Sequence, residues 1–449
     1  MAKVLFYGGA QEVTGSSFLF DDGKTKILID CGMFQCPRFC DLRSQAPFPF
    51  NPSELDALLV THAHIDHTGR IPKLAREGFS GKIFSTPPTK ELAALMLEDS
   101  LGVLEKEAKR HGEDLIYEEK DISSALRLWE TVEYHNEFKI GDFKIKFLNS
   151  GHILGSAMVE LEIGGKRVVV TGDLGNPPTP LLKDPEEIRD ANILLVEATY
   201  GDRLHENRVA RKLKLERAIE DTLRAGGVLM LPAFSLERTQ ELLFEINDLM
   251  ESGRVPRVPI FLDSPLAIKA TAVYKKYESY FNREAHEKIK SWDDLFKLPN
   301  VKFTLTTEES KSINEVPAPK IIMAGSGMST GGRILHHERR YLPDPKSTLL
   351  MVGYQAPGSL GRMLQDGARE VMLFGEKIPV CARILMLQGY SAHPDRDWLL
   401  NFVDKSRDSL EKVFAIHGEP ASALFLVQRV RDYLGVEAFA PRYGETYEL

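Results

Sequence analysis

Short apolar runs dominate the first 200 residues of the chain, separated by turns rich in glycine and aspartate. Runs of this length with such boundaries are typical of β-strands, and they fall at residues 3–7, 17–20, 26–30, 55–60, 143–148, 166–171 and 192–197. Two longer segments, 88–111 and 121–129, carry apolar residues at helical spacing and predict helices, the first ended by Gly112. The first part of the chain is therefore expected to be a mixed α/β domain.

The pattern changes near residue 201, where helices and strands begin to alternate. Helices are expected at 207–225 and 236–250, and strands at 226–232, 259–262, 348–353 and 378–387. Such alternation predicts a doubly wound α/β domain, inserted into the first domain at about 201–375. A strand at 413–417 and an amphipathic helix at 421–434 follow, so the first domain, 1–200, is expected to resume at 376–449.

Metal-ligand side chains stand where the predicted strands end. The strand at 55–60 runs into a loop with three histidines and one aspartate, His62, His64, Asp66 and His67. On an extended backbone His62 and His64 point the same way, whereas Asp66 and His67 follow on the turn, so the loop favours two metal ions over one. Strand ends can converge at one edge of a sheet. The other candidate side chains at such ends are His152, Asp173, Glu197, His393 and His417.

Two further strand ends carry weaker signals. Asp30 either orients a metal ligand or only caps a turn, and both interpretations stay open. The Gly-Ser loop at 325–332 leads from a strand into a helix, and its backbone N–H groups are suited to a phosphate. Most glycine-rich loops of this kind are plain tight turns, and this one is not a Walker motif because it lacks GK[ST].

Composition and charge exclude several classes of protein. The 449 residues are 43% apolar and 27% charged, and no apolar run approaches the roughly 20 residues that span a bilayer. The N-terminus lacks a secretory signal, so a cytoplasmic protein is expected. The net charge of −8 argues against nonspecific coating of nucleic acid but not against a nuclease with a local basic cleft. The four cysteines, Cys31, Cys36, Cys40 and Cys381, match no common cluster motif and are expected to be free thiols.

The order of the motifs resembles that of a known family. HAHIDH, SGHILGS and TGDLG, in this order, look like the metallo-β-lactamase superfamily, and VEATYGDR, LQGYSAH and AIHGE are similar to its β-CASP branch, which processes nucleic acids. AGSGMSTGGR and GYQAPGSLGR resemble prokaryotic relatives of the nuclease subunit of the cleavage and polyadenylation specificity factor. The resemblance covers essentially the whole chain. It implies an αββα sandwich with an inserted β-CASP domain. Because the first strand begins at residue 3, the RNA-binding extension of archaeal members is expected to be absent.

The resemblance also implies the roles of individual residues. One zinc ion would be held by His62, His64 and His152, a second by Asp66, His67 and His417, and Asp173 would bridge the two. Asp30 would support the metal loop from behind the ligands. The three β-CASP motif positions would be Glu197, His393 and His417, with His393 as general acid, Glu197 as the residue that orients it, and Asp66 grouped with them as catalytic. Ser326, Gly327 and Arg333 would hold a flanking phosphate.

The implied function is zinc-dependent hydrolysis of RNA, leaving 5′-phosphate and 3′-hydroxyl ends. A histidine at the last β-CASP motif, His417, favours RNA over DNA, and the expected partners are single-stranded RNA and a second copy of the chain in a homodimer. Endonuclease action is expected, with 5′ exonuclease action left open. The alternatives are a small-molecule hydrolase of the same superfamily, a noncatalytic RNA-processing subunit and a DNA nuclease.

Overall fold

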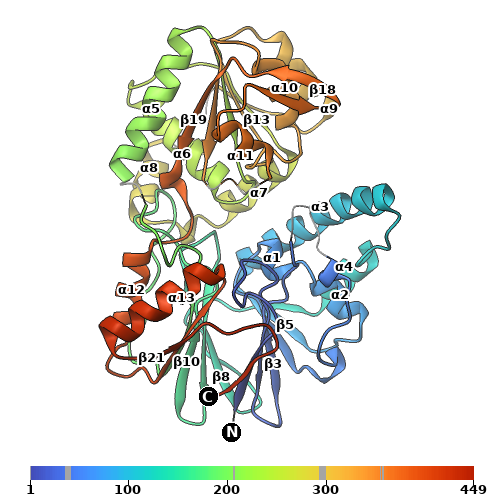
Figure 1. Ribbon diagram of the computed structural model, residues 1–449, viewed down its shortest axis with the longest axis vertical. Coiled ribbons are helices and arrows are strands. Elements are labelled where there is room, and N and C mark those ends of the chain that lie inside the picture. The colour runs from blue at the N-terminus through green and yellow to red at the C-terminus, as the bar shows by residue number, and fades with distance from the viewer. Residues whose placement is uncertain (1, 36–41, 206–207, 293–299, 354, 356–357) are drawn as a thin grey trace. The chain divides into compact units, whose positions relative to one another are not determined.

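The computed structural model describes residues 2–35, 42–205, 208–292, 300–353, 355 and 358–449. The chain forms two compact units (Figure 1). The first comprises Met1–Thr179, Lys183–Leu204 and His393–Leu449, and the second comprises Pro180–Leu182 and His205–Ala392. The second unit extends beyond the boundary expected near residue 375 because β19 (Arg383–Leu387) pairs in parallel with β16 (Thr348–Val352) of its sheet.

The first unit contains two seven-stranded sheets that pack face to face. One has the order β22-β1-β2-β3-β4-β5-β6 and the other β21-β20-β11-β10-β9-β8-β7. The strands of the first are β22 (Thr446–Glu448), β1 (Lys3–Phe6), β2 (Phe18–Asp21), β3 (Lys26–Ile29), β4 (Ala57–Leu59), β5 (Lys82–Ser85) and β6 (Trp129–Thr131). Those of the second are β21 (Glu437–Phe439), β20 (Lys412–Ile416), β11 (Ile193–Glu197), β10 (Lys166–Val170), β9 (Ala157–Ile163), β8 (Phe143–Asn149) and β7 (Phe138–Ile140).

Alternation along β11 shows how the layers form. Ile193 and Leu195 pack into the core between the sheets, whereas Leu194 and Val196 pack under helices on the opposite face. The outer helices of this sheet are α12 (Arg396–Asp404) and α13 (Pro420–Arg429), continued by a π-helical turn, η6 (Val430–Leu434). The helices beside the other sheet are α1 (Ile65–Thr68), α2 (Ile71–Arg76), α3 (Pro87–His111) and α4 (Glu119–Arg127), with the 3₁₀ turns η1 (Leu42–Ser44) and η2 (Pro52–Glu54). The result is the expected αββα sandwich (Figure 1).

The second unit is a doubly wound α/β domain, as expected. Its six-stranded parallel sheet has the order β14-β13-β15-β12-β16-β19. The strands not yet located are β12 (Val228–Pro232), β13 (Ile260–Asp263), β14 (Val301–Phe303) and β15 (Lys320–Ala324), with a separate hairpin of β17 (Glu370–Leu373) and β18 (Glu376–Pro379). The helices are α5 (Arg208–Arg224), α6 (Arg238–Glu251), α7 (Pro265–Lys276), α8 (Arg283–Trp292), α9 (Thr307–Ser312), α10 (Ile334–Tyr341) and α11 (Leu360–Gln365), with short 3₁₀ turns η3 (Glu278–Tyr280), η4 (Ile313–Glu315) and η5 (Gln388–Tyr390).

Two of the four cysteines, Cys31 and Cys381, lie among the described residues, and both are free thiols as expected. Cys31 is a buried free thiol and Cys381 an exposed one, whereas Cys36 and Cys40 lie outside the described residues. Burial raises the pKa of the Cys31 thiol to about 12, so it is unreactive at neutral pH. Among the described residues, every helix is too short or too polar to span a lipid bilayer.

A buried carboxylate, Asp263, organises the second unit at the end of β13. It accepts hydrogen bonds from Thr304 Oγ1 (2.7 Å), Ser310 Oγ (2.7 Å), Arg333 Nη1 (2.8 Å) and His337 Nε2 (2.8 Å). Burial alone would raise the pKa of Asp263, but these four donors hold it well below its usual value.

Asp263→Ala is expected to lower the free energy of unfolding of the second unit by about 3–5 kcal/mol, because it leaves four hydrogen-bond donors, the Arg333 guanidinium among them, without their buried acceptor. Since the folded pKa is lower than the unfolded value of about 3.9, the carboxylate stabilises the fold above about pH 4 and the effect is lost as the pH falls. Urea unfolding of both proteins between pH 7 and pH 2 checks this. A difference that grows on acidification would contradict it.

Candidate metal centre

The loop after β4 is shaped by a close approach of two backbone segments. The chain after β3 runs beside the short helix α1, with hydrogen bonds from Cys31 N to His67 O (2.8 Å) and from Met33 N to Ile65 O (2.9 Å). Between them, a Cβ added at Gly32 would lie 1.6 Å from the carbonyl oxygen of Asp66. Only glycine fits there, and this contact holds the turn that presents Asp66 and His67.

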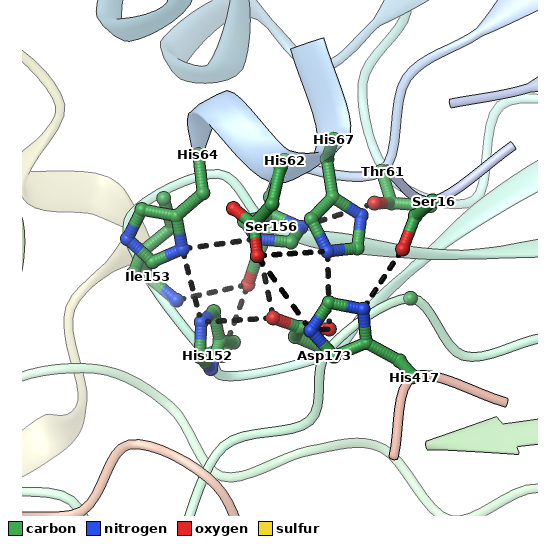
Figure 2. A network of polar contacts seen from close by, with 12 residues as sticks. Ser16, Thr61, His62, His64, His67, His152, Ile153, Ser156, Asp173 and His417 are labelled. Carbon is green, nitrogen blue, oxygen red and sulfur yellow. Dashed lines mark hydrogen bonds and ion pairs between the residues drawn. The ribbon is translucent and has the colours of Figure 1, made fainter. Parts of the chain in front are cut away.

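The predicted ligands gather in two clusters at one edge of the sandwich (Figure 2). The first comprises His62, His64, His152 and Asp173, and the second Asp66, His67 and His417; within each cluster the ligand atoms lie within 4.8 Å of one another. They converge because β8, β10, β11 and β20 run in the same direction in one sheet, and β3 and β4 run parallel in the other. His417 completes the second cluster from the far end of the chain.

Asp173 presents one carboxylate oxygen to each cluster. Oδ2 lies 3.5 Å from Nε2 of His62 and 3.5 Å from Nε2 of His152. Oδ1 lies 3.3 Å from Nε2 of His67 and 3.7 Å from Nε2 of His417. Asp66 Oδ2 faces the same two imidazoles at 4.0 and 3.6 Å. This arrangement is the one a bridging carboxylate requires.

The unpaired atoms of the site fit metal ions. His67 Nε2 and Asp173 Oδ1 are buried and have no hydrogen-bond partner among the described residues, a costly state that a bound cation relieves. The pKa of His62 and that of His152 lie well below the usual value, and burial is the main cause. Both imidazoles are therefore neutral, as metal binding requires. Imidazole and carboxylate donors together suit divalent transition metals, so the residues present could hold two such ions.

The remote nitrogens of four imidazoles are each held by another group. His67 Nδ1 lies 2.7 Å from Asp30 Oδ2, His62 Nδ1 3.0 Å from Thr61 Oγ1, His152 Nδ1 3.2 Å from Leu174 O, and His417 Nδ1 2.8 Å from Ser16 Oγ. Such contacts set the ring orientation and leave the other nitrogen for the metal. Asp30 also accepts hydrogen bonds from the N–H and hydroxyl groups of Thr61, both at 2.8 Å, so it ties the loop and a ligand together.

Asp30→Asn is expected to weaken metal binding by about 10–100-fold, because asparagine cannot accept from His67 Nδ1–H and from both Thr61 donors at once. Competition with a chelator measures the affinity. A matched control is Asp56→Asn, which removes a carboxylate that accepts from Lys26 N at the other end of β3. Equal metal affinity of the wild-type protein and Asp30→Asn would leave Asp30 with a turn-capping role only.

Glu197 and His393 form a pair beside the first cluster. Both Glu197 oxygens lie 3.0 Å from His393 Nδ1, and Glu197 Oε1 also accepts from Leu174 N at 2.7 Å. Glu197 is fully buried, and the His393 ring centre lies 4.7 Å from that of His152. Burial alone would lower the pKa of His393, but the Glu197 carboxylate raises it to about 9. The raised pKa favours the protonated imidazolium, and the contact with Glu197 holds the ring beside the first ligand cluster.

The candidate phosphate loop belongs to the second unit. The Arg333 guanidinium donates to Asp263 Oδ1 and to the carbonyl oxygens of Thr304 and Leu305, each at 2.8 Å. Ser326 Oγ accepts from Thr330 N at 3.0 Å, and Gly327 O accepts from Gln355 Nε2 at 3.1 Å. These contacts fix the position of the Arg333 guanidinium. Tyr354, Ala356 and Pro357 of the second glycine-rich segment lie outside the described residues.

Comparisons with known proteins assign the family. The model of the metallo-β-lactamase superfamily matches residues 10–219, that of the Beta-Casp domain 239–364, and that of a Zn-dependent metallo-hydrolase RNA specificity domain 377–441. The chain is also 36% identical over 443 residues to a protein named Ribonuclease TTHA0252 from Thermus thermophilus, with 99% of both chains covered. The chain belongs to the β-CASP branch of the metallo-β-lactamase superfamily. The resemblance noted from the motifs is thereby confirmed.

Other β-CASP relatives carry different names. An RNase J-like protein from Methanocaldococcus jannaschii is 33% identical over 453 residues, with 99% of both chains covered. Transcription termination factor FttA of the same organism is 32% identical, covering 98% of this chain and 70% of that protein. A solved structure, a protein of unknown function from Enterococcus faecalis, matches with a TM-score of 0.54 at 12% identity over 100% of both chains, a likeness of fold alone.

Proposed function

We propose that this β-CASP protein is a zinc-dependent ribonuclease that hydrolyses phosphodiester bonds in single-stranded RNA and leaves 5′-phosphate and 3′-hydroxyl ends. The observation that carries the proposal is the pair of Glu197 and His393 beside two metal-ligand clusters bridged by Asp173. A charged imidazole next to a hydrolytic metal site is suited to protonate a poor leaving group such as a ribose 3′ oxygen. The names of two relatives, a ribonuclease and an RNase J-like protein, support RNA as substrate.

Two groups of side chains would each hold one Zn²⁺ ion. One set is His62, His64 and His152, the other is Asp66, His67 and His417, and Asp173 joins both. Bound zinc supplies Lewis acidity, which lowers the pKa of a water from about 16 to about 7 and withdraws charge from a phosphate oxygen. The match of residues 377–441 to the family model of a Zn-dependent metallo-hydrolase RNA specificity domain supports zinc as the metal.

The protein's own residues handle the proton of the leaving group. Glu197 accepts from His393 Nδ1–H, so Nε2 is the nitrogen that carries the transferable proton. A water-derived hydroxide oxygen forms the new bond to phosphorus while the bond from phosphorus to the 3′ oxygen breaks, and the 3′ oxygen takes the proton of His393, so no free alkoxide is expelled. His393 is thus the general acid, Glu197 the residue that orients and charges it, and Asp66 a catalytic ligand. Ser326, Gly327 and Arg333 are proposed to bind a flanking phosphate.

The domains, the assembly and the cellular compartment of the protein are also part of the proposal. We take the first unit as the metallo-β-lactamase domain and the second unit as the β-CASP domain, a homodimer as the assembly and the cytoplasm as the compartment. Size-exclusion chromatography with light scattering tests the dimer.

The decisive experiment is cleavage of single-stranded RNA labelled at either end, with 5′-phosphate and 5′-hydroxyl forms compared. Internal products are expected for endonuclease action, and mononucleotides from the 5′-phosphate form for exonuclease action. DNA of the same sequence and a thioester and a lactone serve as competing substrates. Cleavage of DNA alone, turnover of the small molecules alone, or RNA binding without cleavage would each replace the proposal by the corresponding alternative.

A further inference from the structure

A strip of alternating arginine and aromatic side chains runs over the surface of the first unit, beginning beside His393. The Tyr200 ring centre lies 6.2 Å from that of His393, and the Arg203 guanidinium lies 5.6 Å from the centre of the Tyr200 ring. The loop of Arg203 joins the start of α12 through a hydrogen bond from Arg396 N to Arg203 O of 3.1 Å. The strip therefore starts at the proposed general acid and passes to α12.

The strip continues along α13, the red helix in Figure 1. The Arg396 guanidinium lies 6.0 Å from the centre of the Phe425 ring, and Arg429 lies 5.1 Å from Phe425 and 4.8 Å from Tyr433. Phe425, Arg429 and Tyr433 are four residues apart, so they share one face of the helix. The arginine–aromatic strip comprises Tyr200, Arg203, Arg396, Phe425, Arg429 and Tyr433.

Three observations suggest that the strip has a use besides packing. Tyr433 is 59% exposed, a large aromatic surface to leave in water. It stands on η6, which is a π-helical turn. Such turns are uncommon in proteins, and those that occur are often at functional sites. Asp202 and Asp397 pair with Arg203 and Arg396, but Arg429 makes no ion pair with a described residue.

We propose that the arginine–aromatic strip binds the single-stranded RNA that flanks the scissile phosphate. This inference rests on the proposed function. Aromatic faces stack bases of any sequence and guanidinium groups pair with phosphates, the two contacts that single-strand-binding surfaces combine. The eight residue steps from Phe425 to Tyr433 rise about 12 Å along the helix. At about 3.4 Å for each stacked nucleotide, α13 accommodates three to four bases.

The alternative interpretation is that the rings and guanidinium groups only stabilise one another. Exposed cation–π contacts contribute about 0.5–1 kcal/mol each. If the strip only stabilises the fold, substitutions in it lower the free energy of unfolding and leave the RNA affinity unchanged. A second copy of the chain is the other occupant that an exposed aromatic surface could take. The experiment must separate these three outcomes and must not depend on catalysis.

The test measures binding of a fluorescent single-stranded oligouridylate of about 12 nucleotides by anisotropy, in a His393→Ala background that slows turnover by about 100–10,000-fold. Tyr433→Ala is expected to weaken binding about tenfold or more at all salt concentrations, because it removes a stacking surface. Arg429→Gln is expected to weaken binding and to reduce the slope of log affinity against log salt by about 0.7, the value for one lost phosphate contact on a single strand.

Two matched controls lie in the same unit. Leu424→Ala removes a side chain that is 54% exposed on α13 but outside the strip, and Arg407→Gln removes an exposed arginine after α12. Both should leave affinity and salt slope unchanged. Unchanged affinity in Tyr433→Ala and Arg429→Gln overturns the inference, and dissociation of a dimer in Tyr433→Ala without a change in affinity assigns the strip to self-association. Strip-dependent RNA binding in a wild-type chain that cleaves no RNA would refute the proposed function alone.

Discussion

Asp173→Ala is expected to abolish metal binding and RNA cleavage together. Asp173 directs one oxygen to His62 and His152 and the other to His67 and His417, at 3.3 to 3.7 Å. Its loss removes the carboxylate that faces both clusters and lies against all four of these imidazoles. Lewis-acid stabilisation contributes several kcal/mol and each 1.36 kcal/mol is a factor of ten, so cleavage should fall by about 1,000-fold or more.

Metal content by mass spectrometry and cleavage of labelled RNA should be measured on one preparation. Asp142→Ala, which removes a side chain that is 67% exposed on the same unit, should change neither quantity. Circular dichroism shows whether Asp173→Ala still folds. Full cleavage by a folded Asp173→Ala protein would refute the two-metal proposal, and loss of cleavage with full metal content would give Asp173 a role other than that of a ligand.

His393→Ala is the second large effect and separates chemistry from metal binding. The His393 ring donates from Nδ1 to Glu197, which raises the pKa of the ring, so removal of His393 leaves the 3′ oxygen without a proton donor. General acid catalysis contributes about 100–10,000-fold, and kcat should fall by that factor. The metal content should stay at the wild-type value, since the two ligand clusters are complete without His393.

The matched control is His111→Ala at the end of α3, which removes a partly exposed imidazole that faces Glu107. It should cleave RNA at the wild-type rate. A large loss of metal in His393→Ala would make His393 a ligand, and an unchanged kcat would assign the proton transfer to another group. Single-turnover measurements on RNA ensure that the chemical step and not product release is compared.

The convergence of the site could be foreseen from the sequence because it follows from strand periodicity. Each candidate ligand stands directly after an apolar run, and parallel strands bring such positions to one sheet edge. His62, His152, Asp173 and His417 lie together for this reason. The doubly wound second domain was also predicted correctly, since regular alternation of helices and strands marks it. The αββα sandwich of the first unit was expected from the family resemblance, because the strand pattern alone indicates only a mixed α/β domain.

The groups that hold the ligands could not be foreseen. Ser16 Oγ forms a hydrogen bond with His417 Nδ1, 401 residues away in the sequence. Nothing in the sequence around Ser16 distinguishes it from serines in other Gly-Ser turns. Thr61 sits inside the metal motif, which is the only signal that could have found it. Apolar pattern also missed a break: one strand was predicted at 378–387, whereas β18 ends at Pro379 and β19 begins at Arg383, because proline cannot donate to a sheet ladder.

The position of β20 between β11 and β21 has a consequence for the synthesis of the protein. His417 stands at the tip of β20, so the second ligand cluster lacks a member until β20 has been made and has paired with β11. Domains generally fold in the order in which they are made, at about 5–20 residues per second, and the first sheet is complete only when β22 joins β1. The second ligand cluster can therefore form only after the whole of the segment His205–Ala392 has been made and the chain has returned to the first unit.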